Sequence, residues 1–104
     1  MKTDYTLAEI AGMIDHTVLA PSSRYEVFEA ACIFALENHC ASVCICPFFV
    51  KGCARLLKGS GVKTCTVIGF PHGTHATAAK VAEAKLAISD GAEELDMVVN
   101  ISKV

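Results

Sequence analysis

The sequence predicts an α/β fold in which parallel strands alternate with helices. Strand-like runs alternate along the chain with segments whose apolar residues recur at helical spacing. The strand-like runs are almost continuously apolar, which is typical of parallel strands covered on both faces. One strand and one helix together occupy about 25 to 30 residues, the size of a barrel βα unit. Four such strands form a partial sheet, equal to half of an eight-stranded barrel.

Composition limits the classes of function. The chain has 104 residues, 53% of them apolar, and a net charge of −2. This balance gives no basic patch for nucleic acid or an anionic membrane. No apolar run reaches the roughly 18 residues of a membrane span, and the first residues do not form a signal peptide. We therefore expect a cytoplasmic protein with one partial domain, residues 1–104, truncated after its fourth strand.

The first unit has clear boundary signals. The segment Thr6-Leu7-Ala8-Glu9 is a capping box that predicts a short leading helix. A first strand is expected at 13–19. A second capping box, Ser23-Arg24-Tyr25-Glu26, predicts a helix that reaches about His39. The residues expected on its inward face are Val27, Ala31, Phe34 and Ala35.

The remaining elements follow the same alternation. They are expected as a strand at 41–46, a helix at 48–58, a strand at 62–70, a helix ending at Asp90 and a strand at 95–101. Thr74 or Thr77 is the expected N-cap of the last helix, and Gly91 is its expected C-terminal glycine. Its expected inward residues are Val81, Ala84 and Ile88.

One carboxylate lies within the apolar run of the fourth strand. Asp96 stands between Leu95 and Met97 in a strand predicted to be buried. A buried acid costs several kcal/mol unless it is paired or used. We therefore predict that Asp96 is a catalytic or substrate-contacting residue.

Other polar groups should gather at the same rim, because parallel α/β folds place chemistry at the carboxyl ends of their strands. These groups are Asp15, His16, Thr17, Cys44, Cys46, the segment 70–73 and Asn100. Each has a structural alternative. The two thiols can serve as small apolar residues, and His16 can hydrogen-bond to backbone or to a carboxylate.

The sequence predicts neither a metal nor a cofactor. Its six cysteines include no CxxC pair, so we expect reduced and mostly buried thiols. His72 and His75 lack a partner at ligand spacing. No GxGxxG or P-loop motif occurs.

Four segments together resemble the successive strand motifs of the deoxyribose-phosphate aldolase family. They are Ile14-Asp15-His16-Thr17-Val18-Leu19, Ala41-Ser42-Val43-Cys44-Ile45-Cys46-Pro47, the segment 62–73 ending in Gly69-Phe70-Pro71-His72-Gly73, and Glu94-Leu95-Asp96-Met97-Val98-Val99-Asn100. The resemblance covers essentially the whole chain. It implies the N-terminal half of a TIM (β/α)8 barrel with a short leading helix. It also implies a metal-free class I lyase that cleaves 2-deoxy-D-ribose 5-phosphate to glyceraldehyde 3-phosphate and acetaldehyde.

The resemblance assigns roles to individual residues. Asp96 matches an aspartate of the proton relay, Asp15 and Thr17 match positions near the substrate and the catalytic lysines, and Cys44 matches a thiol beside the active site. The family's Schiff-base lysine lies on the sixth strand, a second lysine on the seventh, and the last βα loops hold the phosphate. None of these segments is in the 104 residues. We therefore expect the isolated chain to be inactive.

Two alternatives stay open. The chain could be a non-enzymatic half-barrel that self-associates or complements a partner, or it could belong to another phosphate-handling barrel enzyme. A small sugar phosphate is the expected ligand of the full-length parent. We also expect self-association through open sheet edges, with Ile14, Val43, Val67 and Val98 facing water.

Overall fold

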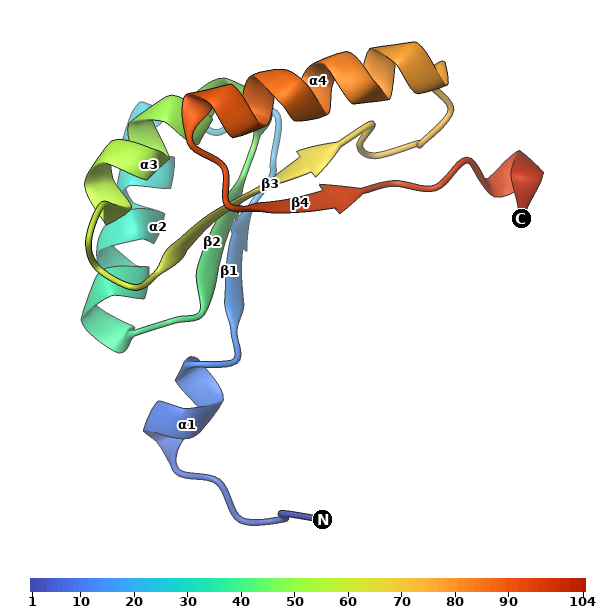
Figure 1. The fold of residues 1–104 in the computed structure, drawn as a ribbon. Helices are drawn as coiled ribbons and strands as arrows, with labels where there is room; N and C mark the ends of the chain where they lie inside the picture. The colour runs from blue at the N-terminus through green and yellow to red at the C-terminus, as the bar shows by residue number, and fades with distance from the viewer.

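The computed structural model describes all residues, 1–104, as one four-stranded parallel sheet with helices (Figure 1). The strand order is β1-β2-β3-β4, so each strand pairs with its neighbours in sequence. The elements are α1 (Leu7–Ala11), β1 (Asp15–Val18), α2 (Tyr25–Asn38), β2 (Ser42–Ile45), a 3-10 turn (Pro47–Phe49), α3 (Val50–Leu57), β3 (Lys63–Ile68), α4 (Thr77–Asp90), β4 (Glu94–Met97) and a second 3-10 turn (Ile101–Lys103). The predicted order of elements is confirmed, with shorter strands.

All three long helices cover the same face of the sheet, and the other face is open (Figure 1). The core lies between α2, α3 and the sheet, where Phe28, Val43 and Ile45 are at most 1% exposed. Val43 faces this core, so the prediction that it faces water is wrong. Val67 is also buried, because it packs beside Cys44 and Cys65 on the opposite face.

The leading helix starts at the predicted capping box. The Glu9 backbone N–H donates to Thr6 Oγ1 over 3.1 Å, and the Thr6 N–H donates to Glu9 Oε2 over 2.9 Å. This reciprocal pair satisfies two backbone donors that the first turn otherwise leaves free. The helix buries no side chain.

The second capping box does not form. Arg24 is the N-cap of α2 and makes no side-chain hydrogen bond. The inward face is also rotated from the predicted one, because Val27 and Phe34 are about half exposed. The buried residues of the helix are Phe28, Ala31, Cys32 and Ala35. They follow helical spacing too, so periodicity alone could not select between the two faces.

Helix α4 differs from expectation in the same way. Its N-cap is Ala76, so neither threonine caps it. Val81 and Ile88 are exposed, and the buried residues are Lys80 and Ala87. A lysine was not expected inward because an ammonium is costly to bury without a partner. The predicted ending is confirmed, since Gly91 closes the helix in the left-handed region.

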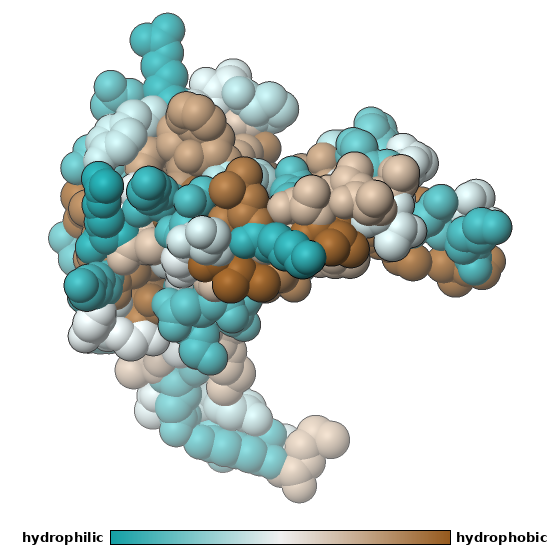
Figure 2. Space-filling view, turned by 45° about the horizontal axis from the view of Figure 1, so that its top comes forward, coloured by the Kyte–Doolittle hydropathy of each residue, from teal (hydrophilic) through white to brown (hydrophobic).

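Strand β4 is an exposed edge, which corrects the prediction of a buried strand. It pairs only with β3, and both Asp96 and Met97 are exposed. Beyond β4 the chain continues as an arm that ends in a short 3-10 turn (Figure 1). Apolar surface continues along this arm, at the right of Figure 2. The structure contains no helix with the length and apolarity that a membrane crossing requires.

Candidate functional site

The open face of the sheet carries the candidate site. Side chains alternate between the two faces of a strand. Val43 and Ile45 face the helices, so Ser42 and Cys44 face the open side. The register places Thr17 beside Cys44, Cys44 beside Cys65, and Val67 beside Asp96. Polar and thiol side chains from all four strands thus meet on one face.

Four of these groups form a compact cluster. Ligand atoms of Asp15, Cys44, Cys65 and Asp96 all lie within 4.8 Å of one another. Cys65 Sγ lies 3.6 Å from Asp96 Oδ2, and Cys44 Sγ lies 4.0 Å from the same oxygen. The two thiols are buried and the two carboxylates are exposed. Asp96 therefore has thiol donors on one side and open space on the other.

Asp15 is held by a second polar contact. Ser42 Oγ donates to Asp15 Oδ1 over 2.6 Å from the adjacent strand. This short hydrogen bond to a charged acceptor fixes the orientation of the carboxylate. Thr17 Oγ1 donates to the Asp15 backbone carbonyl over 2.8 Å. Thr17 lies beside the cluster without being one of its four members.

The two thiols are protonated at neutral pH. Burial raises the pKa of Cys44 to about 11, and the nearby Asp15 and Asp96 carboxylates add to this effect. Burial also raises the pKa of Cys65. The negative charges of Asp15 and of Cys44, once Cys44 is ionised at high pH, raise this pKa further. Protonated thiols donate to Asp96 and do not act as nucleophiles.

Cysteine sulfur and carboxylate oxygen are both ligands that zinc ions bind in proteins. No sequence motif indicates such a set, because its members are distant along the chain. The prediction that no metal is bound stays a prediction. Elemental analysis of the purified chain, with stoichiometric zinc as the contradicting result, tests it.

Several predicted rim residues lie away from the cluster. His16 packs against Phe34 of α2 with tilted rings whose centroids are 4.7 Å apart, so it lies on the helix side of the sheet. Cys46 Sγ points to the Leu19 carbonyl at 3.8 Å. Asn100 caps the terminal 3-10 turn by accepting from Ser102. These three side chains contact other parts of the fold and not the cluster.

Sequence reasoning missed Cys65 and Ser42. Both lie on the open face next to predicted residues, Cys65 beside Cys44 and Ser42 beside Asp15. The available signal was the alternation of each strand together with a parallel register. The register depends on tertiary pairing, which the sequence did not specify.

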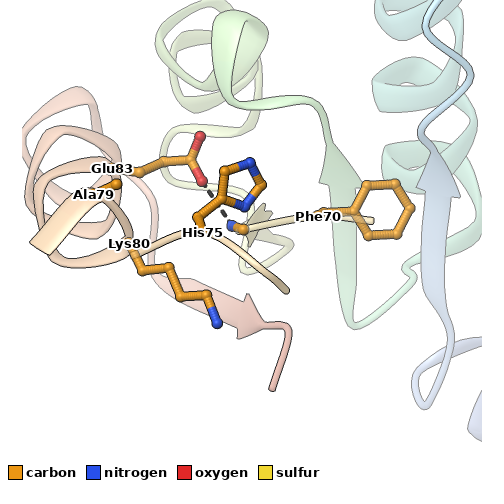
Figure 3. Close-up of a pocket in the computed structure, with 6 residues that line it drawn as sticks. Phe70, His75, Ala79, Lys80 and Glu83 are labelled. Atoms are coloured by element: carbon orange, nitrogen blue, oxygen red, sulfur yellow. Dashed lines mark hydrogen bonds between the residues drawn. The ribbon is translucent and has the colours of Figure 1, made fainter. Parts of the chain in front are cut away.

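Two of the hollows near the carboxyl ends of the strands adjoin the end of β3. One, of about 480 Å³, is lined by residues that follow β1, β2 and β3, including Leu19, Cys46 and Phe70. The other is a cavity of about 130 Å³ between α4 and the end of β3. His75, Lys80 and Glu83 line it, as Figure 3 shows. The first hollow adjoins the open face and is large enough for a small organic ligand.

Residues 10–103 match the family described as DeoC/LacD family aldolase. The match spans nearly all of the sheet and its helices. The chain belongs to this family.

Its relatives support the assignment over the same region. A deoxyribose-phosphate aldolase of Rhodopirellula baltica is 50% identical over 101 residues, which is 97% of this chain and 42% of that enzyme. A crystal structure of a candidate deoxyribose-phosphate aldolase from Coccidioides immitis superposes with a TM-score of 0.92 at 40% identity, over 97% of this chain and 40% of that one. The deoxyribose phosphate aldolase from Aeropyrum pernix gives 0.89 at 31% identity, over 94% and 42%.

The chain spans about two fifths of the length of the relatives that it matches. Its four parallel strands, connected as βα units, match the N-terminal part of the aldolase TIM barrel. The predicted family and fold are therefore confirmed.

Proposed function

We propose that this chain supplies the N-terminal half of the active site of a class I aldolase that cleaves 2-deoxy-D-ribose 5-phosphate. The products are glyceraldehyde 3-phosphate and acetaldehyde. Asp96 serves as general acid and base in the proton relay. Asp15, Thr17 and Cys44 form the adjoining wall.

The position of Asp96 is the main support for this proposal. Its carboxylate lies on the open face near the carboxyl end of β4, exposed on one side and contacted by the Cys65 thiol on the other. A general acid or base must reach the reacting atom and exchange a proton with it. No basic side chain of this chain pairs with it, since Lys2 and Glu9 form the single salt bridge. A substrate or an amine from another segment can therefore approach the carboxylate.

The chain alone is expected to be inactive because none of its lysines is placed as a Schiff-base nucleophile. Lys63 opens β3 at the rim opposite the site. Lys80 is buried behind the sheet and donates to a backbone carbonyl. Lys103 lies in the exposed terminal turn. An aldehyde needs an accessible neutral amine to form an iminium.

A chimera tests the proposal. In it, this chain replaces the matching N-terminal 42% of the Rhodopirellula baltica enzyme. We expect the chimera to cleave deoxyribose 5-phosphate and to be trapped by borohydride as an acetaldehyde adduct. The isolated chain, treated identically, should gain no adduct mass. A folded but inactive chimera contradicts the proposed function, and turnover with a trapped adduct on the isolated chain contradicts its inactivity.

A second candidate is a non-enzymatic half-barrel that associates with itself or with a partner. It is favoured by the two sheet edges, β1 and β4, each of which has one neighbouring strand. Association alone does not separate the two candidates, because it can also complete a catalytic barrel.

A further inference from the structure

Lys80 is the one charged side chain that the fold buries, with 9% of its surface exposed. The proposed chemistry does not use it. Its Nζ donates to the Val98 carbonyl over 2.8 Å. Val98 comes two residues after Asp96, at the end of the strand that carries the proposed acid. A buried ammonium with this contact requires an explanation.

The contact supplies a hydrogen-bond donor to a carbonyl at the end of the sheet that has no backbone partner. The Val98 N–H donates to the Ile68 carbonyl over 2.9 Å, which extends the β3–β4 ladder by one position. In a regular parallel ladder the Val98 carbonyl would next accept from the N–H of residue 70. The chain instead leaves β3 at Gly69, which has a φ of +66°. The Lys80 ammonium donates to Val98 in place of that backbone group.

Gly69 is needed for this arrangement. A Cβ at this position would lie 2.9 Å from Lys80 Cε and 3.3 Å from its Cγ. The lysine stem therefore runs directly over the glycine backbone. Because Gly69 has no side chain, the lysine stem can pass over it and bring the ammonium from α4 to the end of β4.

Glu83 makes the matching contact from the same helix face. Residues three apart on a helix are neighbours on its surface. The Gly69 N–H donates to Glu83 Oε1 over 2.8 Å, as the dashed line in Figure 3 shows. The carboxylate satisfies a donor that β2 cannot reach, because β2 ends at Ile45 and the chain turns at Pro47. Helix α4 thus hydrogen-bonds to a backbone group just beyond the end of β3 and to another just beyond the end of β4.

We propose that Lys80 and Glu83 are positioning residues that fix the carboxyl ends of β3 and β4 and so hold Asp96 in place. The inference rests on the proposed function, because it gives the pair a role in aldol cleavage without contact to substrate. Misplacement of a reacting group by about 1 Å can cost about 100-fold in rate. A strand end that carries the acid therefore benefits from an anchor.

Hydrogen–deuterium exchange of this chain tests the anchor itself. Lys80→Met keeps the apolar stem and removes the ammonium, whereas Lys80→Arg keeps a donor. Lys85→Met is the matched control, because Lys85 is exposed on the same helix. We expect Lys80→Met to speed exchange of peptides containing Val98 by about 10-fold, with the other two variants close to wild type. Glu83→Ala should do the same at Gly69, and it provides a second test if Lys80→Met does not fold.

Kinetics of the chimera test the consequence. We expect Lys80→Met to lower kcat by about 10-fold, to leave KM within about twofold, and to change the pH profile of kcat. Lys80→Arg should restore both the rate and the profile, which a loss of folded protein would not predict. Unchanged exchange, or an unchanged kcat in an active chimera, overturns the inference. An inactive wild-type chimera counts against the proposed function, while the exchange measurement still decides whether the anchor exists.

Discussion

At Asp96, one carboxylate has thiols at 3.6 and 4.0 Å and an open side. If it relays protons, an isosteric amide that cannot ionise should abolish that step. We expect Asp96→Asn in the chimera to lower turnover by at least about 100-fold, the lower range for a general acid or base. Steady-state assays of deoxyribose 5-phosphate cleavage provide the measurement.

The control is Asp90→Asn, which changes a carboxylate at the end of α4 and away from the cluster. It should retain wild-type turnover. Near wild-type turnover of a folded Asp96→Asn chimera would assign Asp96 a structural role instead.

Cys44 should be far less reactive than an ordinary thiol. Its pKa is raised to about 11 from an ordinary 9.0, first by burial and then by the nearby carboxylates. At pH 8 this shift lowers the thiolate fraction about 100-fold. Iodoacetamide labelling followed by peptide mass spectrometry should therefore modify Cys44 slowly in the folded chain and readily in urea.

The same shift predicts alkaline destabilisation. The folded state holds the Cys44 proton more tightly than the unfolded state, so the stabilisation is full below pH 9 and is lost as the pH rises from 9 to 11. The unfolding free energy should fall by up to about 1.4 kcal/mol per pH unit in this window. Equal labelling of Cys44 in the folded and unfolded chains would contradict both expectations.

The candidate site was predictable where one residue carried the signal. Asp96 stood out because an acid interrupts an apolar run, and the motifs marked Asp15, Thr17 and Cys44. Cys65 gave no such signal, because a thiol in an apolar strand resembles any small apolar residue. Its place in the cluster depends on the β2–β3 register.

Among the elements, α2 provides the largest side chain of the core. Phe28 stacks on Phe49 with centroids 4.5 Å apart and meets Tyr25 edge-on at 4.6 Å. Phe28→Leu should lower the unfolding free energy by about 1–2 kcal/mol, because it removes these aromatic contacts and leaves space in the core.

Urea denaturation at one fixed protein concentration measures the change, since association shifts apparent stability. Phe48→Leu is the matched control, because Phe48 is 88% exposed. It should change the free energy by less than about 0.5 kcal/mol. Equal effects of the two substitutions would argue against a helix–sheet core centred on Phe28.

Helix boundaries were predictable, but helix faces were only partly so. The Thr6–Glu9 box and Gly91 act through local backbone groups, which short sequence patterns report directly. The inward face depends on what each helix packs against. In α4, Lys80 faces inward because the Val98 carbonyl offers it a partner. Such a partner is known only once β4 is placed.

At the scale of the whole molecule, the fold is more extended than its length suggests. The radius of gyration is 14.7 Å, whereas a compact domain of about 100 residues has one near 13 Å. The excess comes from α1 and the C-terminal arm, which project from the sheet (Figure 1). Both edges of the sheet lie next to exposed apolar side chains: Met13, Ile14, Met97 and Val99.

We predict that the chain self-associates through these edges, because unpaired strands recruit other strands. Sedimentation velocity over a dilution series should reveal species above 11.0 kDa that dissociate on dilution. Met97→Lys should weaken association, because it places a charge at the β4 edge. Leu86→Lys is the control, since Leu86 is exposed on α4 away from both edges. A monomer at every concentration would contradict the prediction.

The cluster on the open face allows the geometry of association to be tested. A two-fold pair that closes into an eight-stranded barrel would join β4 of each copy to β1 of the other. Its interior would then enclose two copies each of Asp15 and Asp96, with no basic side chain of the open face to neutralise them. Enclosing like charges is costly.

Closure therefore predicts that Asp96→Asn strengthens the dimer. Pairing at the edges alone leaves the open face hydrated and predicts no change. For a closed pair, the dissociation constant of Asp96→Asn should fall by about 10-fold or more, equivalent to about 1.4 kcal/mol. An unchanged dissociation constant would exclude the closed pair and favour association through open edges.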